Sequence, residues 1–134
     1  MKSIMLVYTA LVAYTSACLY QDADLKSSIE RGKDLYSDFC VTCHMANGEG
    51  VANVFPPLVN SDYLARNREE SIRGVKFGQS GKIVVNGIPY DNVMVAPGLE
   101  DDEIADVMNF VMNSWGNSSD QPVTPEEVAG IMPN

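Results

Sequence analysis

Two cysteines and a histidine form the most reactive cluster in this sequence, within the string Cys40-Val41-Thr42-Cys43-His44. The pattern C-x-x-C-H is the attachment signature of a c-type haem. In that chemistry the two thiols add across the vinyl groups of the porphyrin. The histidine that follows then lies under the ring, where it can ligate the iron. The string therefore predicts a covalent cofactor and one of its two axial iron ligands.

Two other uses of a Cys-x-x-Cys pair fit the surrounding sequence less well. A thioredoxin-like redox pair belongs in a βαβ unit, whereas this pair follows a helical stretch and leads into a loop. A structural zinc site needs four cysteine or histidine ligands, and the whole chain has three cysteines and one histidine. Haem attachment is therefore the favoured interpretation of Cys40, Cys43 and His44.

The start of the chain is typical of a secretory signal, with a positive residue, a short apolar run and a small-residue exit. Ser16-Ala17-Cys18 resembles the lipobox of bacterial lipoproteins, although Thr15 stands where an aliphatic residue is usual. We therefore expect a signal peptide over residues 1–17 and a polar tether over residues 18–26, lipidated at Cys18. Residues 27–134 would form one domain in the periplasm or on the periplasmic face of a membrane. Cleavage elsewhere, leaving or removing a free Cys18 thiol, is the alternative.

Acidic residues outnumber basic ones and are unevenly distributed. The formal net charge is −9, and residues 83–134 contain nine acidic residues and no lysine or arginine. Residues 18–82 nearly balance, with eight basic and nine acidic residues. Such a surface repels the phosphates of nucleic acid, which argues against that class of partner. It suits a protein with a basic docking patch, or it serves solubility alone.

Apolar periodicity and turn residues predict short helices, one hairpin and long loops. A helix is expected from Ser27 or Ser28 to about Phe39, with Ile29, Leu35, Tyr36 and Phe39 on its apolar stripe. Gly32 interrupts this helix, which a close helix crossing would justify. The long irregular stretch over residues 45–59 is expected to be functional. The other expected elements are helices over 62–65, 68–75, 100–114 and 125–131, and a hairpin within 81–95 around Asn86-Gly87.

With these features the chain resembles the class I c-type cytochromes. That family has an all-α fold, in which N- and C-terminal helices cross around a covalently bound haem, here with a short β-hairpin before the methionine loop. The similarity rests on a helix with Gly32 and Tyr36 before the C-x-x-C-H string, a loop with Phe55-Pro56-Pro57-Leu58, a methionine loop, and a helix with Ile104-Ala105.

Further strings narrow the resemblance to small bacterial monohaem cytochromes that occur alone, as dehydrogenase subunits, or fused to copper nitrite reductases. These strings are Ser61-Asp62-Tyr63, Val85-Asn86-Gly87 with Tyr90, and Asn113-Ser114-Trp115-Gly116-Asn117. The resemblance covers about residues 27–131.

The resemblance implies a role for each matching residue. Cys40 and Cys43 would hold the haem through thioethers, and His44 would be the proximal ligand. The Pro56 carbonyl would accept a hydrogen bond from the other ring nitrogen of His44, which fixes the imidazole and raises its basicity. The remaining implied pocket residues are Leu58, Tyr63 and Tyr90.

The same resemblance implies a helix crossing and a site for the haem propionates. Gly32 and Tyr36 would meet Phe110 and Val111 where the first and last helices cross. Arginine forms charge-assisted hydrogen bonds with carboxylates, so the propionate candidates are Arg66, Arg68 and Arg73, together with Tyr63. The alternative is that these arginines are exposed on solvated turns.

Met94 is the distal ligand that the resemblance implies. Among the seven methionines, it is the one in a loop between hairpin and helix, fifty residues after His44. Met108, by contrast, falls on the apolar stripe of the last helix. In many relatives proline follows the methionine at once, whereas here Val95-Ala96-Pro97 follows. Glu100 is a second departure, since relatives often have Ser or Thr at this helix cap.

The expected function is one-electron transfer by a single haem with His44/Met94 ligation, because a filled sixth position leaves no site for substrate. The expected donors are a quinol-oxidising complex or a dehydrogenase, and the acceptors a terminal oxidase or a nitrogen-oxide reductase. Membrane contact is expected only through a lipid at Cys18. The alternatives are a dedicated cytochrome subunit of a larger oxidoreductase, and an open-site haem sensor or peroxidase.

Mass spectrometry of the exported protein tests the expected N-terminus. If the lipobox is used, the mature chain begins at Cys18 and carries the added mass of a lipid. A Cys18→Ser variant should lose that mass, because serine lacks the thiol that receives the lipid. An unmodified Cys18, or a mature chain from which it is absent, would contradict lipidation.

Overall fold

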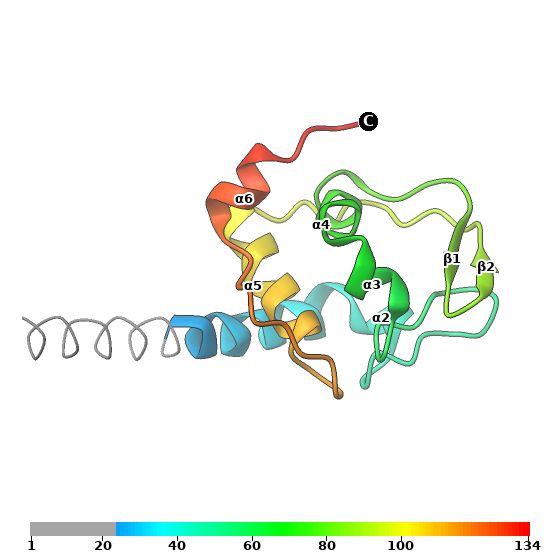
Figure 1. Cartoon of the computed structure of the whole chain (residues 1–134), viewed down its shortest axis with the longest axis horizontal. Helices are drawn as coiled ribbons and strands as arrows, with labels where there is room; N and C mark the ends of the chain where they lie inside the picture. Colours follow the sequence, from blue (N-terminus) through cyan, green and yellow to red (C-terminus); the bar gives the residue numbers. More distant parts are fainter. Residues whose placement is uncertain (1–23) are drawn as a thin grey trace, which may run out of the picture.

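The computed structural model describes residues 24–134. The predicted signal peptide, Cys18 and most of the predicted tether lie outside this range. The described elements are a helix over residues 24–39, hereafter the N-terminal helix, followed by α2 (Val41–His44), α3 (Asp62–Arg66), α4 (Arg68–Phe77), β1 (Ile83–Val85), β2 (Ile88–Tyr90), α5 (Asp101–Met112) and α6 (Pro125–Gly130). Among these residues no helix is long and apolar enough to cross a membrane. The mainly helical architecture confirms the expected fold class (Figure 1).

The N-terminal helix and α5 cross in close contact at Gly32 (Figure 1). A Cβ atom at this position would lie 2.0 Å from the Asp106 carbonyl oxygen and 2.9 Å from the Phe110 Cβ. The two backbones can approach this far only because glycine has no side chain. The expected reason for a glycine inside this helix is therefore confirmed.

Aromatic rings surround the crossing on the side that leads to the C-x-x-C-H string. The Tyr36 ring lies 5.4 Å from the Phe110 ring and 5.1 Å from the Trp115 ring, measured between centroids. The Tyr36 hydroxyl donates a hydrogen bond of 2.7 Å to the Met45 carbonyl oxygen. Because Met45 directly follows His44, this bond ties the end of α2 to the helix crossing.

The N-terminal helix ends at residue 39 as expected but differs from the expectation at its start and in its buried stripe. Residues 24–26 are helical, so Ser27 and Ser28 lie inside the helix, and the prediction that either one caps it is wrong. Ser28 is buried instead, and its hydroxyl donates to the Asp106 carboxylate at 2.6 Å. Phe39 does not join the buried stripe, because its side chain is 51% exposed.

The hairpin and the last two helices form as expected. Val85 pairs with Ile88 across Asn86 and Gly87, which both have positive φ angles as a type I′ turn requires. Helix α5 begins after Glu100, whose backbone N–H donates to the Glu103 carboxylate at 2.9 Å. The departure at Glu100 therefore leaves the helix start intact.

Apart from the residues packed at the helix crossing, a separate hydrophobic core joins α4, α5 and α6. Its fully or nearly fully buried members include Ile72, Ile104, Met108 and Val128. Helix α6 begins as its sequence predicts, with the Thr124 hydroxyl accepting a hydrogen bond from the Glu127 N–H at 3.2 Å. This core fixes α4 against α5, and α4 in turn borders the site described below.

We predict that Gly32→Ala strongly destabilises the protein. The added methyl group meets backbone atoms, which cannot rotate away, so the free energy of unfolding should fall by about 3 kcal/mol, the upper end of the usual cost of overpacking. Gly130→Ala, at a helical position with no heavy atom within 4 Å of the added carbon, is the matched control. It should change stability by less than about 1 kcal/mol. Denaturant unfolding of the haem-loaded protein measures the free energy of unfolding of both variants. Equal losses would show that the close contact at Gly32 is not what limits this position to glycine.

Candidate haem site

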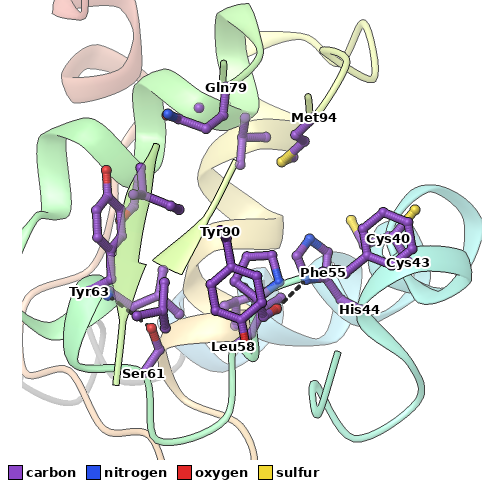
Figure 2. Close-up of a pocket in the computed structure, with 18 of the residues that line it drawn as sticks. Cys40, Cys43, His44, Phe55, Leu58, Ser61, Tyr63, Gln79, Tyr90 and Met94 are labelled. Carbon is purple, nitrogen blue, oxygen red and sulfur yellow. Dashed lines mark hydrogen bonds between the residues drawn. The ribbon is translucent and has the colours of Figure 1, made fainter. Parts of the chain in front are cut away.

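A cavity of about 370 Å³ lies beside α5, between the C-x-x-C-H string on one side and the loop that carries Met94 on the other. Figure 2 shows part of the set of side chains that line it. Met94 lies fifty residues after His44, yet it borders the same cavity as Cys40, Cys43 and His44. The predicted pocket residues border it too: Pro56, Leu58, Tyr63 and Tyr90.

The two cysteines are placed by a continuous run of backbone hydrogen bonds. The Cys40 N–H donates to the Tyr36 carbonyl, and the N–H groups of Cys43 and His44 both donate to the Cys40 carbonyl. The resulting turn of helix, α2, places both sulfurs at the cavity wall (Figure 2). Burial, together with the neighbouring Cys43, raises the pKa of the Cys40 thiol to about 11. The thiol is therefore protonated at neutral pH in the haem-free chain.

His44 is held in one orientation by the backbone of the following loop. Its Nδ1 lies 3.0 Å from the Pro56 carbonyl oxygen, which assigns the proton to Nδ1 because a carbonyl can only accept. Nε2 is therefore free as a ligand, and in Figure 2 this nitrogen points to the side of the cavity where Met94 lies. Burial lowers the pKa of His44, although the Pro56 carbonyl opposes this effect. The imidazole is thus held neutral, as iron ligation requires.

The loop after His44 folds back on glycines. The Gly50 N–H donates to the His44 carbonyl oxygen at 3.0 Å, and the N–H groups of Leu58 and Val59 both donate to the Gly48 carbonyl oxygen. Gly50 has φ +63°, and a Cβ atom there would lie 2.4 Å from the Phe55 carbonyl oxygen and 2.7 Å from that of Pro56. Gly50 is therefore the residue that lets the Pro56 carbonyl reach His44.

The backbone of Met94 is held by an isolated antiparallel β-bridge to Gln79. Its N–H donates to the Gln79 carbonyl oxygen at 2.8 Å, and the Gln79 N–H donates to the Met94 carbonyl oxygen at 2.9 Å. In Figure 2 the Met94 sulfur lies across the cavity from the His44 ring. A flat ring seated between them would have nitrogen on one face and sulfur on the other.

Two of the three arginines that were candidates for binding the propionates form ion pairs with carboxylates of the chain itself. The Arg68 guanidinium binds the Glu127 carboxylate in a fork, with distances of 2.6 and 2.7 Å. Arg73 binds Glu69 and Glu70. These arginines are thus neutralised by carboxylates of the chain itself, and the expectation that they hold propionates is not supported. Arg66 is exposed and lies 3.7 Å from the Asp62 carboxylate.

Sequence reasoning missed residues on the distal side and at the rim. Gly78 and Gln79 contact the Met94 backbone, yet nothing in their sequence context signals a partner fifteen residues away. Phe39, Val93 and Val95 line the cavity while remaining 51%, 67% and 80% exposed. The exposure of Phe39 places it at the rim of the cavity rather than in the core, and its sequence position on the apolar stripe carries no signal that separates these two roles.

The donor set and the cavity fit a covalently attached haem. Two thiols and a neutral imidazole lie at one wall, a thioether lies opposite, and the lining between them is largely apolar. When bound, haem iron supplies one-electron chemistry by changing between ferric and ferrous states.

Comparison with known proteins agrees with this geometry. The family model for cytochrome c matches residues 29–115. The chain is 37% identical over 106 residues to cytochrome c-552 of Thermus thermophilus, covering 72% of this chain and 80% of that protein. It is 33% identical over 104 residues to the cytochrome c subunit of alcohol dehydrogenase (quinone) from Gluconacetobacter polyoxogenes, covering 75% of this chain but 22% of that subunit. The gluconate 2-dehydrogenase cytochrome c subunit of Pantoea cypripedii is 30% identical over 105 residues, with 24% of its length covered.

The chain belongs to the cytochrome c family. Membership implies covalently bound haem c with its iron and a role in electron transfer, as a carrier rather than as an enzyme. The resemblance found in the sequence to class I c-type cytochromes is thereby confirmed.

We predict that Gly50→Ala raises the reduction potential. The added methyl group must displace the Pro56 carbonyl, which weakens its bond to His44 and lowers the basicity of the imidazole. Gly81→Ala is the matched control, because Gly81 has φ +84° but no heavy atom within 4 Å of the added carbon. Left-handed strain should cost both variants about 1–2 kcal/mol of stability, and Gly50→Ala should lose more because its methyl group also meets backbone oxygens. Redox titration should show a shift for Gly50→Ala alone; an equal shift in both variants would contradict this role of Gly50.

Proposed function

We propose that the protein is a monohaem electron carrier in which His44 and Met94 are the axial ligands. The observation that carries this proposal is the placement of the His44 ring and the Met94 sulfur on opposite sides of one cavity (Figure 2), whose wall also holds Cys40 and Cys43. One C-x-x-C-H string occurs in the sequence, which supports one haem per chain. With both axial positions filled, no open site remains for a substrate.

The chain's own residues would set the redox properties of this site. The Pro56 carbonyl keeps the His44 proton on Nδ1 and fixes the ring plane, and the thioether of Met94 favours the reduced metal and so raises the potential. The apolar lining excludes water, which limits reorganisation on electron transfer. Cys40 and Cys43 hold one edge of the ring next to the exposed Phe39, so the route for electrons would lie at this rim.

The partners we propose are redox proteins outside the cytoplasm. The donor would be a quinol-oxidising complex or a dehydrogenase, and the acceptor a terminal oxidase or a nitrogen-oxide reductase. Export through residues 1–17, with Cys18 as a lipid anchor and residues 27–134 as the domain, would keep the protein at the periplasmic face. The nine acidic residues within 83–134 suit a partner with a basic docking patch.

A dedicated subunit of a larger oxidoreductase is a second candidate. The similarity to cytochrome c subunits of two dehydrogenases favours it. Isolation from membranes with a stoichiometric catalytic chain would select this candidate over a free carrier.

The visible spectrum tests the proposed ligation. We predict a low-spin ferrous spectrum and, in the ferric state, the weak red band of sulfur-to-iron charge transfer. Met94→Ala should abolish that band and open the iron, since alanine has no donor atom. Met132→Ala is the matched control, because Met132 is 68% exposed and should retain the spectrum. A high-spin wild-type spectrum would instead support a sensor or peroxidase, and absence of covalent haem would refute the site.

A further inference from the structure

The loop that carries Met94 has few attachments of its own. Within the described part of the chain, both backbone hydrogen bonds of residues 91–99 join Met94 to Gln79. Val93 and Val95, which flank Met94, are highly exposed. A segment with so few hydrogen bonds and contacts opens at a low free energy.

The same loop is also attached by the Asn92 side chain, which donates to the Val54 carbonyl oxygen at 2.9 Å, and by Leu99, which packs against the core. Gln79 is nevertheless the residue that bonds to the Met94 backbone itself, so whatever holds Gln79 affects how firmly Met94 is held.

Gln79 is positioned by the end of α4. The helix ends at Gly78, whose N–H donates to the Gly74 carbonyl oxygen at 3.0 Å. Gly78 has φ +89°, and a Cβ atom there would lie 2.9 Å from the Met94 carbonyl oxygen. Helix α4 and the Met94 loop are thus in direct backbone contact, and a shift of the helix would carry the loop with it.

Helix α4 is itself held by residues 117–134, hereafter the C-terminal segment. Arg68, in the first turn of α4, binds the Glu127 carboxylate in a fork and donates to the carbonyl oxygens of Gln121 and Pro122, both at 3.0 Å. Arg68 lowers the pKa of the Glu127 carboxyl, so this ion pair is fully formed at neutral pH.

Two further cations along α4 bind the same segment. Lys76, in the last turn of α4, donates to the Val128 carbonyl oxygen at 2.7 Å, and Arg73 donates to that of Met132 at 2.9 Å. Lys76 also pairs with the Asp101 carboxylate at the start of α5, at 3.0 Å. The C-terminal segment lies beyond residues 29–115, which the cytochrome c family model matches. It therefore binds α4 along its whole length without belonging to the matched family core.

We propose that the C-terminal segment is a brace that stabilises the Met94–iron bond. It holds α4 through Arg68 and Lys76, and α4 holds Met94 through Gln79. This inference rests on the proposed ligation of iron by Met94. Arg68 and Lys76 would be positioning residues, since neither borders the cavity itself.

Competition by imidazole for the sixth iron position measures the brace in the ferric, haem-loaded protein. Arg68→Gln removes the fork to Glu127, and Lys76→Gln removes the bond to Val128 together with the pair to Asp101. Imidazole should bind about fivefold more tightly in each, the effect of losing one partly exposed charged contact. Arg68→Gln is the deciding variant, because its ion pair is with the C-terminal segment.

Arg31→Gln is the matched control, because Arg31 lies on the N-terminal helix and pairs with Asp106 at 2.6 Å. It should lower global stability but leave imidazole affinity unchanged.

Denaturant unfolding of each variant separates the brace from general stabilisation. The proposal is supported if imidazole affinity rises in the two α4 variants and stays at the wild-type value in Arg31→Gln, although that control also loses stability. It is overturned if affinity follows global stability equally in all three variants, or does not change in the α4 variants. Wild-type protein without the sulfur-to-iron band, binding imidazole as tightly as Met94→Ala, would instead refute the Met94 ligation and the brace together. A wild type with the band and unaffected variants refutes the brace alone.

Discussion

The close approach of two backbones at Gly32 is the constraint on which the rest of this structure depends. It fixes the axis of the N-terminal helix against α5, and Cys40 follows that helix directly. The Cys40 N–H still donates to a carbonyl of that helix, so the position of the cysteines is determined by the crossing. Because α5 also borders the cavity through Val107, Met108 and Val111, one contact sets both the attachment point and the back wall of the haem site.

The polar groups at this crossing are satisfied within it. The Asp106 carboxylate is buried and accepts hydrogen bonds from Ser28 and from Arg31. Asn109 donates to the Ser28 hydroxyl and to the Val123 carbonyl, and it accepts from the Val123 N–H. A buried carboxylate without such partners would cost several kcal/mol. The network therefore allows a charged residue at the closest point of the crossing and also attaches the chain after α5.

Local patterns predicted much of this fold and of the proximal side of the site. Asn86-Gly87 predicted its hairpin because the turn needs two positive φ angles, and C-x-x-C-H needs only one helical turn to bring its donors together. Predictions that depended on distant partners were less successful. Serine often caps the start of a helix, but the Ser28 hydroxyl instead donates a hydrogen bond across the helix crossing to Asp106. Arginine is a residue type that can bind a haem propionate, but Arg68 binds the carboxylate of Glu127, fifty-nine residues later in the chain.

The two sides of the site differ in how they are held, and this difference follows from chain connectivity. His44 lies one residue after Cys43 and is fixed further by the Pro56 carbonyl, so it has little freedom once the thioethers form. Met94 lies in a loop whose backbone bonds reach Gln79 alone within the described chain. Thioether sulfur is also a weaker iron donor than imidazole. If His44 and Met94 ligate the iron as proposed, changes in ligation are therefore expected to begin on the Met94 side, where the contacts of α4 hold the loop in place.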